Sequence, residues 1–318
     1  MAALLAGVAL SSCEPDPTTA PGDAGGSRLL LLVSDRNQSA GQFDIYLYDL
    51  DNLGFRQISG INAVNAADLN PTLSPEGRFI AFQSTRVGGV GGSDIYLYDR
   101  AIFNYTPLPG INTTADETEP FFAYNGRYLA FTQIERNFKQ VRLLDGLPDT
   151  LIDLSGLNTS TSNNSAPSPN NDALRIAFVS DRNGNDDVFV YDSAGDSLLA
   201  LPDLISPATD TEPWITPDGR FLCFASDRAG GAGGFDLYLY DMVALSFVTL
   251  APALNTAQTE RNPSLSNDGV VIVFESDRTG SVNNSMDLWN HDRNTGAIGQ
   301  APGESSSAAD LQPSLHWP

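Results

Sequence analysis

Short apolar runs separated by turn-forming residues fill most of the chain. In residues 212–241 an extended run follows Pro213, Pro217-Asp218-Gly219 supplies a tight turn, and a second run, RFLCFASDR, leads into a glycine-rich loop. A third run, DLYLYD, ends at Asp241. Proline and glycine at these places are typical of turns, whereas the aromatic and β-branched residues between them favour strands. The pattern therefore predicts short β-strands joined by tight turns.

The same unit recurs six times along the chain. Its copies align on an arginine at the end of the second strand, and the spacings are 50, 50, 46, 46 and 50 residues between Arg36, Arg86, Arg136, Arg182, Arg228 and Arg278. A strand of the DIYLYD type follows each arginine, and a weaker fourth run, such as residues 244–250, completes the unit. Four short strands in just under fifty residues are typical of propeller blades rather than helical repeats.

The two ends of the chain predict how the ring closes. The first unit lacks its opening strand and starts directly at Arg28-Leu29-Leu30, while Gln312-Pro313-Ser314-Leu315 supplies that strand at the other end. A blade shared between the termini removes two exposed sheet edges. We therefore predict an all-β fold: a six-bladed β-propeller of four-stranded antiparallel blades, closed by the C-terminal strand joining the first blade.

The repeat resembles that of the TolB-type, WD-repeat-like propeller family. The matching segments are Asn70-Pro71 with Ser74-Pro75-Glu76-Gly77-Arg78, Glu212-Pro213-Trp214 with Pro217-Asp218-Gly219-Arg220, and Asn262-Pro263 with Ser266-Asn267-Asp268-Gly269. The pattern covers residues 28–318 and departs from the family in the third unit, at Tyr124-Asn125-Gly126, and in the fourth, at residues 169–172. The resemblance implies a propeller that binds a partner protein in the bacterial cell envelope.

The first 27 residues predict export and anchoring. Residues 1–12 are apolar and small, as in a secretory signal, and are too short to span a membrane. The order Leu-Ser-Ser before Cys13 resembles the lipoprotein box, which implies lipidation of Cys13; a non-lipidated signal peptide is the alternative. Residues 13–27 are rich in Pro, Gly, Thr and acidic residues and predict a flexible tether. We expect a location in the bacterial envelope, lipid-anchored on the periplasmic side or at the surface.

The charge narrows the range of partners. The chain has 17 basic and 39 acidic residues, a net charge of −22 and a pI near 4.1. Nucleic acids and anionic lipids are poor partners for such a chain, because phosphate binding needs concentrated Lys and Arg.

Cys223 lies in an apolar strand, so the two cysteines predict neither a disulfide nor a zinc site. We expect a monomer.

The predicted strand order places the loops on two faces. With the NPTLSP-type strand innermost, the loops after each Ser-Asp-Arg and the connectors between blades emerge on one face, here called the connector face. The opposite face, here called the turn face, has only tight turns, such as Pro75-Glu76-Gly77. Because binding residues concentrate in loops on rigid scaffolds, the connector face is the predicted functional face.

Carboxylates from several connectors are predicted to converge at the central opening. The candidates are Asp68, Asp116, Glu117, Glu119, Asp210, Glu212, Glu260 and Asp310. One hypothesis is an acidic mouth that accepts a cationic partner segment or a cation. The other is that these side chains bind amides of neighbouring strands and fix the channel.

Other polar motifs have structural explanations. Asx turns account for the strand-ending aspartates Asp49, Asp99, Asp145, Asp192, Asp241 and Asp292. Scaffold hydrogen bonds or ion pairs account for Asp35, Asp181, Asp227 and Asp277, each beside an arginine. The glycine-rich loops, at 88–92, 229–234 and 279–285, are expected to be flexible connections or contact surfaces. Oxygen-bearing side chains alternate at Asp181, Asn183, Asn185 and Asp187, which makes them weak candidates for calcium ligands. The alternative interpretation is a polar hairpin loop without a metal.

The sequence favours a non-enzymatic function. His291 replaces a packed tyrosine of the DLYLYD pattern, His316 lies in the closing strand, and no Gly-x-Ser-x-Gly motif is present. We therefore predict a protein–protein interaction module without a cofactor. A carbohydrate-binding or carbohydrate-active propeller, with or without a metal such as Ca²⁺, is the alternative.

Overall fold

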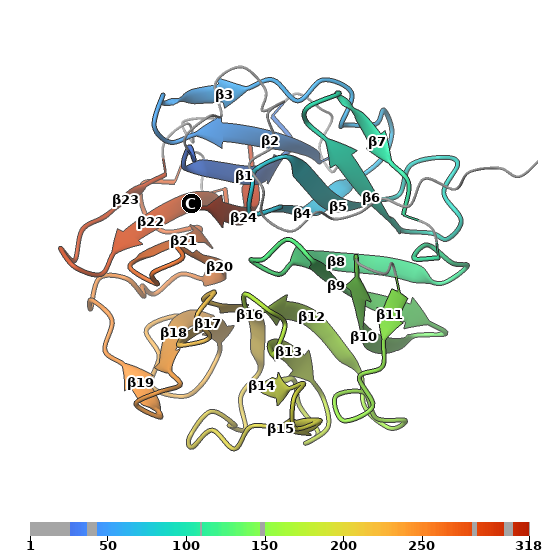
Figure 1. Cartoon of the computed structure of the whole chain (residues 1–318). Helices are drawn as coiled ribbons and strands as arrows, with labels where there is room; N and C mark the ends of the chain where they lie inside the picture. The colour runs from blue at the N-terminus through green and yellow to red at the C-terminus, as the bar shows by residue number, and fades with distance from the viewer. Residues whose placement is uncertain are drawn as a thin grey trace, which may run out of the picture.

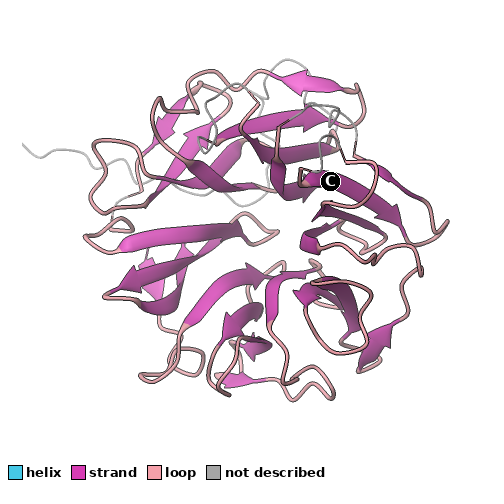
Figure 2. Cartoon of the chain, turned by 180° about the vertical axis from the view of Figure 1, so that it is seen from behind, coloured by secondary structure: helices cyan, strands magenta, loops and turns pink. Residues whose placement is uncertain are grey.

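Six four-stranded antiparallel sheets surround a central axis (Figures 1 and 2). The computed structural model describes residues 26–36, 43–108, 110–146, 150–281, 285–301 and 308–317. The predicted six-bladed propeller is confirmed. No helix among these residues is long and apolar enough to cross a membrane.

The first three blades are built as follows. Blade 1 contains β24 (Asp310–His316), β1 (Leu29–Ser34), β2 (Asp44–Asp49) and β3 (Gly54–Arg56). Blade 2 contains β4 (Asp68–Leu73), β5 (Phe79–Ser84), β6 (Asp94–Asp99) and β7 (Asn104–Thr106). Blade 3 contains β8 (Asp116–Phe122), β9 (Tyr128–Glu135), β10 (Phe138–Asp145) and β11 (Thr150–Ile152).

The other three blades follow the same order from the axis outward. Blade 4 contains β12 (Asn164–Pro169), β13 (Arg175–Ser180), β14 (Asp187–Asp192) and β15 (Ser197–Leu198). Blade 5 contains β16 (Asp210–Ile215), β17 (Phe221–Ser226), β18 (Asp236–Asp241) and β19 (Ser246–Val248). Blade 6 contains β20 (Glu260–Leu265), β21 (Val271–Ser276), β22 (Asp287–Asp292) and β23 (Ile298–Gln300).

The ring closes as the sequence predicts. Strand β24, from the C-terminal end of the chain, pairs antiparallel with β1, with Leu29 opposite His316 and Ser34 opposite Asp310. Figure 1 shows the red end of the chain beside the blue first strand. The pairing joins the two ends of the chain through main-chain hydrogen bonds, so that β1 and β24 cover each other's edges.

The apolar core lies between neighbouring blades. Between blades 4 and 5, for example, Val188 and Val190 share one buried cluster with Ile215 and Phe224. Because each sheet packs on both of its faces, its second strand is mostly apolar rather than alternating. Strand β1, LLLLVS, is buried along its whole length.

One predicted repeat position is wrong. Gln133 in β9 pairs with Glu117, as Ser84 in β5 pairs with Asp68. The residue two places after Ser84 is Arg86, whereas the residue two places after Gln133 is Glu135. Arg136 instead lies in the tight β9–β10 turn with φ of 53°, and its side chain is 91 % exposed. Blade 3 therefore has no equivalent of the repeated arginine.

A connector asparagine closes the edge of the third strand in four blades, a role that the sequence analysis missed. In blade 5, Asn255 Oδ1 accepts a hydrogen bond from Leu237 N (2.9 Å), and its Nδ2 donates to Leu237 O (3.0 Å). The equivalent pairs are Asn62–Ile45, Asn112–Ile95 and Asn158–Val141. The connector from blade 4 to blade 5 has Ile205 at this position. The repeated Ile-Asn or Leu-Asn pair in the connectors is the signal that predicts this contact.

Candidate functional site: the axial pocket

A pocket of about 130 Å³ lies on the propeller axis, where the six innermost strands converge. Its walls repeat one dipeptide: an Xaa-Pro pair from each of these strands. The pairs are Asn70-Pro71, Glu119-Pro120, Ala166-Pro167, Glu212-Pro213, Asn262-Pro263 and Gln312-Pro313. The pocket surface is therefore mostly proline ring, with one further side chain per blade.

The residue before each of these prolines has a left-handed backbone. The six φ values are 50°, 53°, 50°, 56°, 46° and 50° for Asn70, Glu119, Ala166, Glu212, Asn262 and Gln312. The register of the innermost strand shifts beside this residue in all six blades. Such a bulge frees a backbone N–H from the ladder of its own sheet. Non-glycine residues rarely adopt this conformation, so its sixfold repetition marks a built feature.

The freed N–H groups bond side chains of the preceding blade. Asn70 N donates to Gln312 Oε1 (2.7 Å). Further around the axis the same bond recurs in four places: Glu119 N to Gln83, Ala166 N to Glu119, Asn262 N to Glu212 and Gln312 N to Glu275. These five bonds link neighbouring blades in a ring, here called the amide ring.

The amide ring is incomplete at one place. Ala166 has no polar side chain to reach the next blade, and within the described chain no hydrogen bond of this kind reaches Glu212 N. Ala166 and Glu212 both line the pocket. The N–H of Glu212 is therefore left as a backbone donor at the wall of the axial pocket. It lies beside Ala166, which has the smallest side chain of the six residues that precede the prolines. We call this position the Ala166 gap.

Two aromatic residues, Phe121 and Trp214, line the pocket, and Tyr124 lies beside them on the turn-face side. The rings of Phe121 and Trp214 pack edge to face with centroids 4.6 Å apart, and Trp214 Nε1 donates to Tyr124 Oη (2.9 Å). Burial raises the pKa of Tyr124, so its hydroxyl stays protonated at neutral pH. A second cavity of about 140 Å³ lies on the turn-face side of these rings. The aromatic residues thus divide the axial space into two chambers.

Glu275 is a buried acid at the amide ring that the sequence analysis missed. Its Oε1 accepts hydrogen bonds from Gln312 N (2.6 Å) and Asn262 Nδ2 (2.7 Å). Burial, together with the nearby Glu212 carboxylate, raises its pKa to about 7, although the hydrogen bonds from Gln312 and Asn262 act in the opposite direction. The sequence contains a signal for this residue, because the equivalent position in other blades has no acid. It is occupied there by Val33, Gln83, Val179 and Ala225.

Only two of the eight predicted carboxylates line the pocket, and both are engaged. Glu119 Oε2 accepts from Ala166 N (2.8 Å) and Thr132 Oγ1 (2.7 Å). Glu212 accepts from Asn262 N through one oxygen and pairs with Arg261 through the other, at 2.6 Å. For these two glutamates, the geometry matches the hypothesis that the acids fix the channel by binding strand amides.

Most of the other predicted acids begin an innermost strand and are buried away from the opening. The ion pairs are Arg36–Asp310 (2.5 Å), Arg86–Asp68 (2.7 Å), Arg228–Asp210 (2.9 Å) and Arg278–Glu260 (3.1 Å). All four carboxylates have exposed fractions of 0 %. The predicted convergence of these side chains at the mouth is wrong, because the repeated arginine covers each one from solvent.

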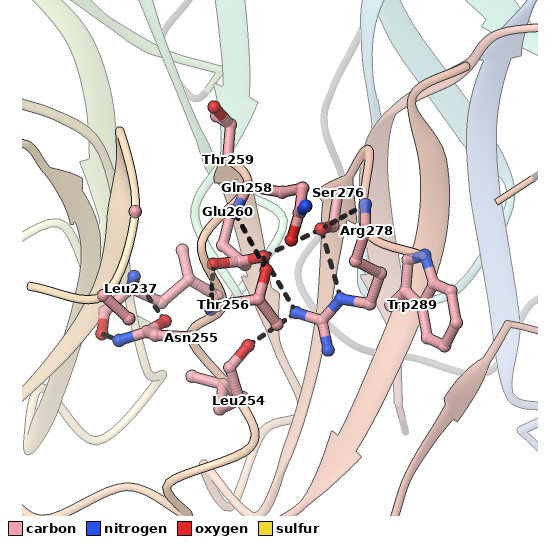
Figure 3. A network of polar contacts seen from close by, with 12 residues as sticks. Leu237, Leu254, Asn255, Thr256, Gln258, Thr259, Glu260, Ser276, Arg278 and Trp289 are labelled. Atoms are coloured by element: carbon pink, nitrogen blue, oxygen red, sulfur yellow. Dashed lines mark hydrogen bonds and ion pairs between the residues drawn. The ribbon is translucent and has the colours of Figure 1, made fainter. Parts of the chain in front are cut away.

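Figure 3 shows one of these arginine plugs, around Arg278 and Glu260. The Arg278 guanidinium donates to Leu254 O (2.5 Å) and Ser276 Oγ (3.1 Å) and lies over the Trp289 ring. Glu260 also accepts from Thr256 Oγ1 (2.6 Å) and Ser276 Oγ (2.8 Å). This plug thus links the connector to the first three strands of its blade.

Glu117 and Asp116 are likewise held by neighbouring groups. Glu117 is fully buried and accepts from Thr113 and Gln133, in a blade without an arginine plug. Asp116 is half-buried, and its Oδ1 accepts from Gly92 N and Ser93 N at 3.0 Å. Neither residue is part of the pocket wall.

The other aspartate motifs have the predicted structural contacts. Asp35, Asp181, Asp227 and Asp277 accept hydrogen bonds from connector amides just before each innermost strand. Five strand-ending aspartates form Asx turns: Asp49, Asp99, Asp192, Asp241 and Asp292. Asp145 pairs with Arg127 at 2.6 Å, and residues 147–149 of the turn that follows it lie outside the described residues.

The weak calcium candidates do not share one centre. Asp181 turns away to bind Asn163 N (2.8 Å) and Nδ2 (2.7 Å). Asn183 and Asn185 both donate through Nδ2 to Asp187, at 3.3 and 3.2 Å. These amides therefore present N–H groups, not oxygens, to the carboxylate. Among the described residues, no group of three His, Cys, Asp or Glu is arranged to hold a metal.

Two of the three glycine-rich loops, 88–92 and 229–234, are close-packed, whereas residues 282–284 of the third lie outside the described residues. A Cβ on Gly231 would lie 1.9 Å from Asp236 Oδ2, and a Cβ on Gly233 would lie 1.9 Å from Gln258 O. Glycine is therefore required because the loop wraps its own aspartate and presses on the next connector. The loop at 88–92 has the same arrangement around Asp94.

Cys223 and His291 both lie in the buried interior of their blades. Cys223 is fully buried, and burial raises the pKa of its thiol to about 12. His291 is buried, its Nδ1 lies 3.2 Å from Ala297 O, and burial lowers its pKa. Cys13, the predicted lipidation site, and most of the predicted tether lie outside the described residues.

Solved structures with the same fold include proteins of different function. TolB from Acinetobacter baumannii superposes with a TM-score of 0.70 at 18 % identity, over 93 % of this chain and 68 % of that one. A protein from Agrobacterium tumefaciens that is assigned as a TolB gives a TM-score of 0.59 at 14 % identity, over 92 % of this chain and 99 % of that one. Oligogalacturonate lyase from Vibrio parahaemolyticus gives 0.56 at 12 % identity, over 87 % and 75 %.

No protein-family model matches the chain. At these identities the structural similarities establish the six-bladed propeller and its likeness to TolB propellers, and nothing about activity.

Proposed function

We propose that this propeller is a non-enzymatic binding module that receives a segment of a partner protein in the axial pocket on the connector face. The observation that carries the proposal is the Ala166 gap. There a backbone N–H, proline rings and the aromatic residues Phe121 and Trp214 line one cavity. An apolar side chain fits such walls, and a main-chain carbonyl can accept from Glu212 N.

The carboxylates have a supporting role in this proposal. Glu119 and Glu212 already bridge neighbouring blades, so they hold the pocket open rather than attract a cationic ligand. Recognition then depends on shape and on one directed hydrogen bond. The setting that we propose is the bacterial envelope, with the chain exported and lipidated at Cys13.

A matched pair of variants at Ala166 tests the proposal. Ala166→Gln introduces the side chain that Gln312 has at the equivalent position, which fills the gap and can accept from Glu212 N. Ala166→Gly keeps the gap and suits the left-handed backbone (φ 50°). Proteins captured by cross-linking from native envelopes are then quantified for both variants and the wild type.

We expect one partner to be captured by the wild type and by Ala166→Gly, and to fall at least tenfold with Ala166→Gln. Equal capture by all three proteins would exclude the axial pocket as the binding site. Circular dichroism and thermal unfolding confirm that both variants are folded.

A carbohydrate ligand is the second candidate. The observation that favours it is the position of Trp214 and Phe121 in both axial chambers, where a sugar ring can pack against aromatic faces. Binding of a glycan that is sensitive to Ala166→Gln, without any captured protein, would favour this candidate.

A further inference from the structure

The turns between the third and outer strands contain an unusual residue choice. Four residues after the strand-ending aspartate, the backbone is left-handed, with φ of 52° at Leu53, 52° at Phe103 and 54° at Leu245. Blade 6 has Gly296 and blade 4 has Asp196 at this position. Glycine, asparagine and aspartate are the residues that tolerate this conformation. A large apolar side chain here is both strained and unsupported by local hydrogen bonding.

These side chains are also exposed to solvent. Leu53 is 66 %, Phe103 53 % and Leu245 47 % exposed, and Ile102 and Val243, in the same turns as Phe103 and Leu245, are 61 % and 73 % exposed. Burial in the fold therefore does not explain them. Strain and exposure at one repeated position indicate a contact outside the chain. We call these five residues the apolar arc.

The apolar arc follows part of the rim of the turn face. Its members come from blades 5, 1 and 2, and the intervening turn belongs to blade 6. Because the blades repeat one geometry around the axis, the equivalent turns lie on the same face of the propeller. The opposite side of the rim has the acidic Asp196 at the same position in blade 4.

The described chain enters the fold in the middle of this arc. Leu29, the first residue of β1, pairs with Asp49 at the turn-face end of blade 1. Trp317, just after β24, packs there under the Arg28 guanidinium at 4.7 Å. Residues 1–25, with the apolar leader and Cys13, precede this point. The segment predicted to carry the lipid thus joins the propeller on the apolar face.

Arginines neutralise carboxylates around the arc. Arg28 pairs with Asp51 at 2.6 Å beside Leu53. Arg78 pairs with Asp99, and Arg220 pairs with Asp241, beneath the turns of blades 2 and 5. The net charge of −22 opposes an anionic surface, but these pairs make the arc compatible with a zwitterionic one.

We propose that the apolar arc rests on a zwitterionic lipid bilayer. The anchor and the arc then act together, because a tethered chain meets the membrane at a high effective concentration. This orientation turns the connector face and its axial pocket away from the lipid. The inference takes its biological setting from the proposed lipid anchoring.

The test uses the full chain coupled through the Cys13 thiol to phosphatidylcholine vesicles that contain a maleimide lipid. Cys223 is fully buried and does not compete for coupling. Acyl-chain-brominated phosphatidylcholine then quenches tryptophan fluorescence wherever an indole approaches the bilayer, and Trp317 lies at the turn-face end of blade 1, between arc residues of blades 5 and 2. Three proteins are compared: the wild type, L53N/F103N/L245N, and the connector-face control V64N/V87N. Asparagine suits the left-handed positions, so the triple variant keeps its fold.

We expect quenching in the wild type and the control, and quenching at least threefold lower in the triple variant. A second variant, I102Q/V243Q, leaves the left-handed positions unchanged and is expected to lower quenching in the same direction. Undiminished quenching in both arc variants, or no quenching in the wild type, would overturn the proposal. Because the coupling is chemical, neither result depends on lipidation in the cell or on a ligand in the axial pocket.

Discussion

Replacing an apolar residue by a polar one is expected to stabilise this protein at residue 205. In four blades an asparagine at the equivalent position bonds both the N–H and the C=O of a third-strand residue, as Asn255 bonds Leu237. In blade 4 the corresponding third-strand residue is Val188, which is fully buried. No side-chain hydrogen bond reaches Val188 within the described chain. Ile205 can neither donate nor accept one.

The expected gain follows from the two missing bonds. Each net hydrogen bond contributes about 1 kcal/mol, so Ile205→Asn gains roughly 2 kcal/mol. Ile205 is 41 % exposed, so its loss removes only part of an apolar contribution, roughly 1 kcal/mol. The net effect is an increase of about 1 kcal/mol in the free energy of unfolding. This corresponds to a rise of about 2–4 °C in Tm.

The assay is urea denaturation followed by circular dichroism, with thermal unfolding as a second measure. The matched control is Asn255→Ile, which leaves the N–H and C=O of Leu237 unpaired and is expected to cost about 2–4 kcal/mol. If Ile205→Asn lowers the stability while Asn255→Ile is harmless, the connector asparagine does not satisfy the strand edge, and the reasoning is refuted.

Three further predictions concern Glu275, the Asp210–Arg228 pair and Gly231. The raised pKa of Glu275, about 7 when folded against 4.5 when unfolded, means that stability falls as pH rises from about 4.5 to 7 and then levels off. In the wild type the free energy of unfolding, measured by denaturation, should be higher at pH 5 than at pH 8, and Glu275→Gln should reduce this difference by roughly 2–3 kcal/mol. An unchanged difference in the variant contradicts the assignment. Asp210→Ala should cost about 3 kcal/mol because it leaves Arg228 buried without its partner, whereas Asp210→Asn should cost less, as Asn164 occupies that position in blade 4; equal losses on denaturation count against the plug. Gly231→Ala should cost about 1–3 kcal/mol through its clash with Asp236, while Gly299→Ala, with open space around the added Cβ, should be neutral in the same measurement.

The blades were predictable because each repeats one local pattern of strand and turn residues. Closure was predictable for the same reason, since the missing first strand and the extra last strand complete one unit. Arg136 was misassigned because spacing alone does not show a one-residue shift of register. In blade 3, Glu135 occupies the position of the repeated arginine, and Arg136 is the next residue along the chain.

The site was only partly predictable, because it depends on the bulge in each innermost strand. The bulge separates Asp68, buried under Arg86, from Asn70, which faces the axis two residues later. Sequence alternation does not reveal such a shift. A proline at a fixed place in every innermost strand was the available signal, because the residue before it forms the pocket wall. The differences among these residues, above all the alanine at 166, then predict where the ring is incomplete.

Photo-cross-linking from the axial pocket tests the central claim most directly. Phe121 is replaced by azidophenylalanine, which has nearly the same shape, and cells are irradiated; the same replacement at Phe103, 53 % exposed on the turn face, is the control. The account predicts an adduct with one protein from position 121 that disappears when Ala166→Gln is added. An adduct that survives Ala166→Gln, or the same partner captured from position 103, would contradict binding in the axial pocket.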